Sequence, residues 1–227
     1  VQIHYVGSNG VAYDKIITVT DVDDENKLDD SNLSVVFDTN TFVFSGRLLD
    51  SFGSPVSGVS VTLSNANGGS ASATSDVEGR FSMVASSGKW ALGVYGYVYD
   101  SRKLPGRFFI YPSSNGDSDR SNWINLTADT NLDLILPPVK TFKINVKDSN
   151  GNAIAGAVAR DRNACTYSTS SIGTSLSYRV GSCALANGGS SLPSDSDGNI
   201  YIYGFAALFE VQIHYVGSNG VAYDKII

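Results

Sequence analysis

The two ends of this sequence carry the same seventeen residues. The run VQIHYVGSNGVAYDKII fills 1–17 and returns unchanged at 211–227. The offset of 210 (211 − 1) predicts a parent protein built from near-identical units about 210 residues long, because a fixed period is the signature of a repeat array. Two other interpretations stay open, a designed terminal overlap and an artefact of how the segment was delimited. Chance does not produce an identity of this length.

A second, weaker repeat relates two parts of the unit through shared Phe, Asp and Gly positions. The aligned segments are 44–61 with 142–159 at an offset of 98, 75–81 with 194–200 and 89–96 with 208–215 at an offset of 119, and 130–136 with 31–37. We therefore expect a complete domain, A, over 39–138 and the body of a second domain, B, over 139–227. Residues 1–38 are then the closing strands of a B-type domain that belongs to the preceding unit.

This division predicts strand complementation between units. If the closing strands of B lie in the neighbouring unit, that neighbour is either the same polypeptide further along or a separate subunit that donates a strand. Pro137 and Pro138 lie in the short linker between A and B, where they limit bending.

The hydrophobic pattern is that of strands. Phe142, Ile144 and Val146 alternate with polar residues, and several other segments of the chain repeat this period of two. Turn signals rich in Gly, Asn and Asp separate the segments, and no 3.6-residue stripe lasts three turns. The charged fraction of 17% is low and suits turn-rich β structure. The sequence therefore predicts an all-β chain of two β-sandwiches in tandem.

The run SGRLLDSFGSPVSGVSVTL, followed by TSDVEGRFSM and WALGVYG, resembles the carboxypeptidase regulatory-like domain. That family is a transthyretin-like, Ig-like sandwich related to the collagen-adhesin B-type repeats of bacterial surface proteins. The resemblance rests on Asp50, the turn with Gly53 and Pro55, and the later Asp76 and Gly79. It implies a non-catalytic module used as a spacer, adhesive or stalk. The Lys–Asn cross-link of such repeats is not expected here, because Lys143 and Lys147 have outward parity.

Domain B contains an insertion of 21 residues (119 − 98) between its second strand and its Asp-Gly hairpin. Both cysteines of the chain, Cys165 and Cys183, lie in this stretch. A disulfide between them would tie down a segment rich in Ser, Thr and Gly and would indicate an oxidising compartment. The alternative is two independent thiols. Zinc is not expected, because no second Cys or His pair stands at ligand spacing.

An acidic run lies within the first 38 residues. Carboxylate oxygens are ligands that Ca²⁺ prefers, so one interpretation of this run is a calcium site. The other interpretation, which we favour, is a solvated loop. The run departs from the EF-hand pattern, with Asn26 in place of the glycine and Asn32 in place of the bidentate glutamate. Its members are Asp21, Asp23, Asp24, Glu25, Asp29 and Asp30, and the five aspartates are the candidate calcium ligands. No other cofactor is expected.

Aromatic residues alternate along one segment of A and continue in the next. Such rings either stack on sugars or cover a sandwich edge or domain contact, and we favour the contact. The candidates are Tyr95, Tyr97, Tyr99, Phe109 and Tyr111, beside Phe108. A surface-displayed glycan-binding module is accordingly the alternative function.

Catalysis and nucleic-acid binding have little support. His4 and His214 are one repeated position, and the sequence has no Ser-His-Asp order, phosphate loop or HExxH helix. The net charge of −6 is spread along the chain without a basic run, and no apolar run approaches the length of a membrane helix. We expect a structural repeat unit of an extracellular fibre or long surface adhesin, not an enzyme, whose partners are neighbouring copies of itself.

Overall fold

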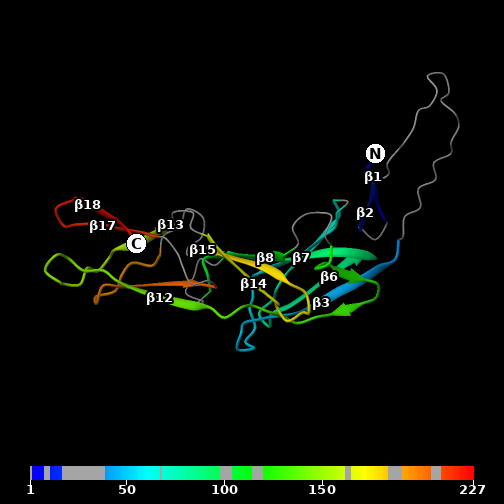
Figure 1. Cartoon of the computed structure of the whole chain (residues 1–227), viewed down its shortest axis with the longest axis horizontal. Coiled ribbons are helices and arrows are strands. Elements are labelled where there is room, and N and C mark those ends of the chain that lie inside the picture. Colours follow the sequence, from blue (N-terminus) through cyan, green and yellow to red (C-terminus); the bar gives the residue numbers. More distant parts are fainter. Residues whose placement is uncertain are drawn as a thin grey trace, which may run out of the picture.

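The computed structural model describes residues 2–7, 11–16, 39–66, 68–97, 104–113, 120–161, 165–183, 191–205 and 211–227. The elements in these ranges are β-strands, so the all-β prediction is confirmed. Within the same ranges no helix is long and apolar enough to cross a membrane. The strands form an elongated molecule in which sandwich A lies at the centre and sandwich B at one end (Figure 1).

Sandwich A consists of two facing sheets. In the first, β3 pairs antiparallel with β6 on one edge and parallel with β10 and β11 on the other. The second runs in the order β5–β4–β7–β8, with β9 paired to the start of β7. The bounds are β3 (Thr41–Leu49), β4 (Ser60–Ser64), β5 (Ser70–Thr74), β6 (Arg80–Ser86), β7 (Gly88–Tyr97), β8 (Arg107–Pro112), β9 (Ile124–Leu126), β10 (Thr130–Asn131) and β11 (Leu134–Ile135).

Sandwich B is smaller in the described residues. One sheet is the pair β12–β16, and the other runs in the order β13–β17–β18. The bounds are β12 (Lys140–Asn145), β13 (Val158–Asp161), β16 (Asn199–Gly204), β17 (Val211–Val216) and β18 (Ala222–Ile226). Its buried apolar residues are Ala157, Ala159, Ile200, Ile202, Val211 and Ile213.

The strand registers of A and B coincide at the two offsets found in the sequence. Phe44 pairs with Met83 in A, and their counterparts Phe142 and Ile202 pair in B, at offsets of 98 and 119. Likewise Val61 pairs with Val94 in A, and their counterparts at the same offsets, Ala159 and Ile213, pair in B. Period-two alternation fixes which residues face the core, so a one-residue slip would have reversed every side chain. The internal repeat is therefore a structural repeat.

The insertion in the sequence of B forms a hairpin that joins the sheet of A. Its strands are β14 (Cys165–Ser170) and β15 (Tyr178–Cys183), and β15 pairs antiparallel with β8 along its whole length. Val180 of this hairpin is 1% exposed and belongs to the core cluster of A. Phe205, which follows β16, packs edge-on against Phe108 with ring centroids 5.3 Å apart. The inserted hairpin and Phe205 therefore pack into the core of A, while sandwich B keeps a core of its own.

The linker predicted between A and B is likewise held. Leu136 is 1% exposed, and its N–H donates to the carbonyl oxygen of Leu49 at 2.8 Å. Val139 packs against the same core cluster. Pro137 and Pro138 lie between these two anchored residues, so bending at this point is restricted by packing as well as by proline.

Candidate assembly interface

The repeated seventeen residues form the same hairpin twice, at opposite ends of the molecule (Figure 1). At the N-terminal end β1 (Gln2–Val6) pairs with β2 (Ala12–Ile16), and at the C-terminal end β17 pairs with β18. The registers are identical, with Gln2 opposite Ile16 and Gln212 opposite Ile226. One sequence thus takes one local structure in two different surroundings.

The C-terminal copy is part of sandwich B. Its strand β17 pairs with β13, and Val211 and Ile213 are 3% and 8% exposed within the core of B. Tyr223, on the inner face of β18 opposite Tyr215, is 53% exposed. The hairpin therefore completes one layer of B, but the core-facing side of its last strand stays uncovered.

The N-terminal copy shows the opposite set of contacts. Tyr13, the counterpart of Tyr223, is 4% exposed, and its hydroxyl donates to the carbonyl oxygen of Thr39 at 3.2 Å. Ile3, the counterpart of Ile213, is only half-buried. One copy thus buries the residues of the first strand and the other copy buries the tyrosine of the second strand.

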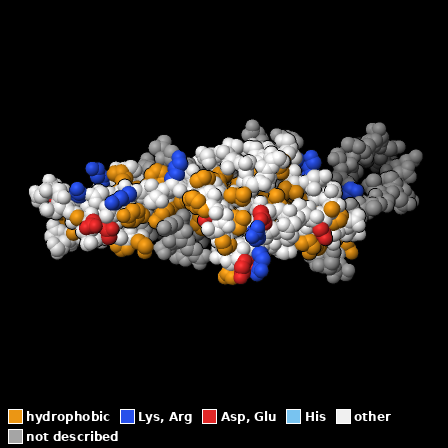
Figure 2. Space-filling model, turned by 90° about the horizontal axis from the view of Figure 1, so that it is seen from below, with side chains coloured by type: hydrophobic (Ala, Val, Ile, Leu, Met, Phe, Trp, Pro, Cys, Tyr) orange, Lys and Arg blue, Asp and Glu red, His pale blue; other side chains and the backbone are white. Residues whose placement is uncertain are grey.

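In the described part of the chain, the outer edge of β12 has no paired strand, unlike the equivalent edge of β3 in A. Among the described residues β12 pairs with β16 alone, whereas β3 is paired on both edges. Phe142 and Val146 are half-buried, although the residues aligned with them in A, Phe44 and Leu48, are fully buried. Figure 2 shows hydrophobic side chains at the surface of the half of the molecule that holds sandwich B. Sandwich B therefore has an open edge above a partly covered core.

In A the corresponding edge is closed by residues 129–136, which we call the closing strand. Its backbone donates to β3 from Leu132 N to Ser45 O and from Leu136 N to Leu49 O, both at 2.8 Å. Its aspartates supply the complementary acceptors, because Asp129 Oδ1 accepts from Val43 N at 2.8 Å and Asp133 Oδ1 from Arg47 N at 2.9 Å. These contacts show that the odd-numbered residues of β3 face the closing strand.

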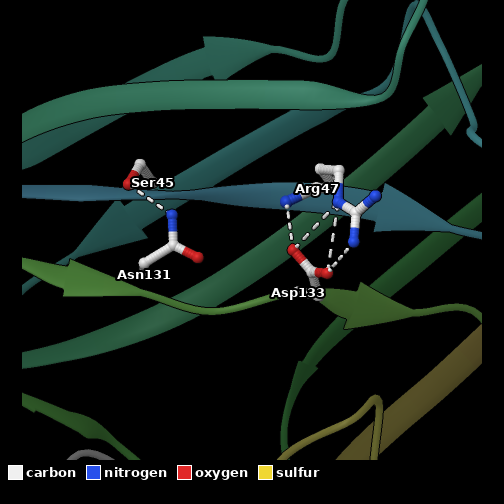
Figure 3. Close-up of polar contacts among 4 residues, drawn as sticks. All are labelled: Ser45, Arg47, Asn131 and Asp133. Carbon is white, nitrogen blue, oxygen red and sulfur yellow. Dashed lines mark hydrogen bonds and ion pairs between the residues drawn. The ribbon is translucent and has the colours of Figure 1, made fainter.

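Side chains reinforce this edge (Figure 3). The guanidinium of Arg47 donates to Asp133 Oδ2 at 2.7 Å from Nη2 and at 3.2 Å from Nε. Asn131 donates to the hydroxyl of Ser45 at 3.2 Å. Hydrogen bonding from the Arg47 side chain lowers the pKa of Asp133, and hydrogen bonding to Asp133, followed by the negative charge of that carboxylate, raises the pKa of Arg47. The closing strand is thus held by backbone, ion-pair and amide contacts at once.

This ion pair predicts a pH dependence for sandwich A. Because the pKa of Asp133 is lower in the folded state, the pair stabilises the fold above the ordinary carboxyl pKa of about 4. The contribution is lost as the pH falls through the folded pKa. We expect the urea midpoint of the wild type to fall more steeply between about pH 5 and about pH 2.5 than that of Asp133→Asn. Asp129→Asn is the matched control, and equal slopes in wild type and Asp133→Asn would contradict the prediction.

Gly46 lets the closing strand approach. A Cβ at this position would overlap the carbonyl oxygen of Leu132. The aligned residue in B is Ile144, which is half-buried on β12. The two edges therefore differ in the space that they leave for a closing strand.

The Asp-x-x-Gly motifs are turns. In each one the aspartate Oδ1 accepts two backbone N–H groups two and four residues ahead, and the glycine has φ between +76° and +85°. Hydrogen bonds from Asn152 and Asn199, respectively, lower the pKa values of Asp148 and Asp195. The four turns begin at Asp50, Asp76, Asp148 and Asp195. Their carboxylates are committed to the backbone, and the described residues contain no cluster of potential metal ligands.

The predicted calcium residues, Asp21, Asp23, Asp24, Asp29 and Asp30, lie outside the described residues. Calcium binding by this run and the solvated loop therefore both stay untested interpretations. The same holds for Tyr99 and for the side chain of Tyr97 among the aromatic candidates.

The described aromatic candidates lie across the strands that join A to the inserted hairpin. The ring of Phe109 covers Gly181 of β15 and reaches Tyr167 of β14, with ring centroids 5.6 Å apart. Tyr111 stacks on Phe109 at 6.0 Å. The guanidinium of Arg179 lies 4.3 Å from the centre of the Tyr167 ring. Tyr95, which pairs with Phe109, is 40% exposed. These contacts are those expected of aromatics that cover a domain contact, and glycan binding stays an untested alternative.

The cysteines are brought into register. Cys165 of β14 lies directly opposite Cys183 of β15, and Cys183 is 1% exposed.

The repeated histidine pairs with a carboxylate, since His214 Nδ1 and Asp224 Oδ1 are 2.9 Å apart on the C-terminal hairpin. Hydrogen bonding from His214 lowers the pKa of Asp224. Both residues lie on strands of an open hairpin, and this pair joins β17 to β18.

No family model matches the chain, and no curated protein matches it. The chain is similar in structure to the shaft pilin SpaA of Lactobacillus rhamnosus GG, with a TM-score of 0.38, 13% identity, and coverage of 82% of this chain and 93% of that one. It is also similar to a "putative adhesin" of Bacteroides ovatus, with a TM-score of 0.37, 11% identity and coverage of 83% and 82%. A third similar structure is the major pilin SpaD of Corynebacterium diphtheriae, with a TM-score of 0.29, 12% identity, and coverage of 82% of this chain and 64% of that one.

Proposed function

We propose that this chain is a structural repeat unit of an extracellular fibre or long surface adhesin, joined head to tail through strands that complete sandwich B. The observation that carries the proposal is the pair of identical hairpins with complementary contacts. One copy packs into B, and the other contacts the start of the next A.

In a repeat array the two copies are one element seen twice. Residues 211–227 of one unit are then residues 1–17 of the next, so a single hairpin makes both sets of contacts. Its first strand pairs with β13, while its second strand presents the tyrosine whose hydroxyl donates to Thr39 O of the following A. Tyr223, which is 53% exposed here, would be buried like Tyr13 at 4%. Burial of a tyrosine ring removes a large apolar area from water and stabilises the junction.

The proposed role is mechanical. The inserted hairpin and Phe205 fuse A to B, and the repeated hairpin fuses B to the next A. Each unit would then contact mainly its neighbours in a line, as in other repeat proteins. A stiff array of this kind serves as a stalk, spacer or filament, and it needs no catalytic group.

A chain of two units tests this role. It has 437 residues (227 + 210), and small-angle X-ray scattering should give a rod whose maximum dimension grows by the length of one unit, independent of concentration. Scattering typical of two units joined by a flexible linker, or a maximum dimension that changes with concentration, would contradict the proposal. Denaturing, reducing gels of the native assembly then separate the two forms of array. One long polypeptide indicates a covalent array, and chains of 24.0 kDa indicate donated strands between subunits.

We also propose a disulfide between Cys165 and Cys183, supported by their register and by the burial of Cys183. Directly opposite residues of an antiparallel pair have Cα atoms about 4.5–5.5 Å apart, inside the range that a disulfide spans. The bond would close a loop of 18 residues (183 − 165) and contribute about 3 kcal/mol. We expect no reactive thiol in the denatured, unreduced chain and two after reduction. Cys183→Ser should lose this stability, Cys165→Ser should lose the same amount, and two thiols before reduction would disprove the bond.

A further inference from the structure

We infer that the open edge of β12 is filled by residues 30–37 of the following unit, in parallel orientation and in one register. The inference rests on the proposed repeat array and names the segment and the contacts that complete sandwich B. The closing strand of A supplies the pattern, because β3 and β12 are equivalent strands at an offset of 98.

The occupant is identified by its sequence. Residues 130–136 of the closing strand read TNLDLIL, and 31–37 read SNLSVVF, at an offset of 99. The residue before each run is an aspartate, Asp129 in one and Asp30 in the other. Asp129 accepts a hydrogen bond from Val43 N, so Asp30 of the following unit would accept one from Thr141 N. One residue of the acidic run thereby has a structural role.

The register follows from the paired residues of A. Thr130 lies opposite Phe44 and Asn131 opposite Ser45, which places Ser31 opposite Phe142 and Asn32 opposite Lys143. Leu134 lies opposite Leu48, which places Val35 opposite Val146.

The apolar side of the segment matches the uncovered core. Leu134 and Leu136 of the closing strand are 0% and 1% exposed in the core of A. Their counterparts Val35 and Phe37 have the same inward parity. In the inferred register they would cover Phe142, Ile144 and Val146, which are half-buried in the present chain.

One difference between the edges makes the closing strand of A specific to its own sandwich. Asn145 and Ser34 replace the pair Arg47 and Asp133, so segment 30–37 would leave Arg47 of A without its carboxylate. Segment 30–37 is therefore disfavoured on the edge of A. Because Ile144 replaces Gly46, the backbone of segment 30–37 would lie further from β12 at Leu33 than the closing strand lies from β3 at Leu132.

Cysteine cross-linking tests the register. The full chain is lengthened at its C-terminus by a copy of residues 18–38, and Asn32→Cys in this copy is combined with Lys143→Cys. Lys143 is exposed, so its substitution leaves the core intact. Oxidation should give the cross-link at least about tenfold faster than in the matched control with Lys147→Cys, because that site lies about 13 Å further along the strand. Peptide masses separate this bond from Cys165 and Cys183.

The outcomes separate this inference from the proposed function. A cross-link to Lys143→Cys together with the two-unit rod supports both. A faster cross-link to Lys147→Cys overturns the register while B is still completed by the next unit. Equal, slow reaction at both sites overturns the occupant, and the rod measurement then decides the proposed function separately.

Discussion

Replacing Gly46 with valine should cost sandwich A about 3 kcal/mol or more. The new side chain would meet the carbonyl oxygen of Leu132, which is backbone and is fixed by the hydrogen bond from Leu132 N to Ser45 O. Overpacking that a side chain can relieve costs about 1–3 kcal/mol, and here the closing strand itself must move. Its displacement would expose Leu134 and Leu136, which are buried in the core.

Urea unfolding followed by tryptophan fluorescence measures this loss. Both tryptophans, Trp90 and Trp123, lie in A, so the signal reports that sandwich alone. Ser45→Val is the matched control, since it places the same side chain one residue away on the other face of β3. The control should change stability by no more than about 1 kcal/mol. If Gly46→Val unfolded like the wild type, the close approach of the closing strand would be disproved.

The second large effect is expected from Val180→Asp in the inserted hairpin. Val180 is 1% exposed and pairs with Ile110 of β8, so the substitution buries a carboxylate without a partner. Such burial costs several kcal/mol. We therefore expect the free energy of unfolding of sandwich A to fall by about 3 kcal/mol or more, and the hairpin to detach from β8.

Hydrogen exchange of β8 measures the detachment. Amides of β8 that donate to β15 should lose protection in Val180→Asp, and the joint between A and B should become flexible in scattering experiments. Thr169→Asp is the matched control, because Thr169 lies exposed on β14 of the same hairpin. If A kept its stability and β8 its protection, the hairpin would not be the element that couples the two sandwiches.

Much of the fold follows from local sequence rules. Alternation placed Phe142, Ile144 and Val146 on one face, and the Asp-x-x-Gly motifs marked turns whose glycines need positive φ. The offsets of 98 and 119 reappear as strand registers, because insertions between strands leave the pairing inside each sandwich unchanged.

The sheet that the inserted hairpin joins could not be predicted from local sequence rules. Its alternating residues fit any sheet edge, and only the three-dimensional closeness of β8 decides that β15 pairs there. The contacts of Asp129 and Asp133 with β3 were also missed, since each joins residues 86 positions apart. One signal was present in the sequence, because an aspartate precedes both 130–136 and 31–37. The sequence shows that the two copies are identical, but their complementary burial is visible only in the structure.

Residue-resolved hydrogen exchange on β12 tests the central claim, completion of B by the next unit, most directly. The chain lengthened by a copy of residues 18–38 is compared with one lengthened by the same 21 residues in scrambled order. By analogy with β3, the odd-numbered amides of Thr141, Lys143 and Asn145 face the open edge, while Phe142 and Ile144 face β16. We predict that exchange at those three odd-numbered positions slows by at least about tenfold only with the authentic extension, because amides buried in a paired edge exchange through opening. Unchanged exchange there, with Phe142 and Ile144 protected in both chains, would contradict completion of sandwich B by the next unit.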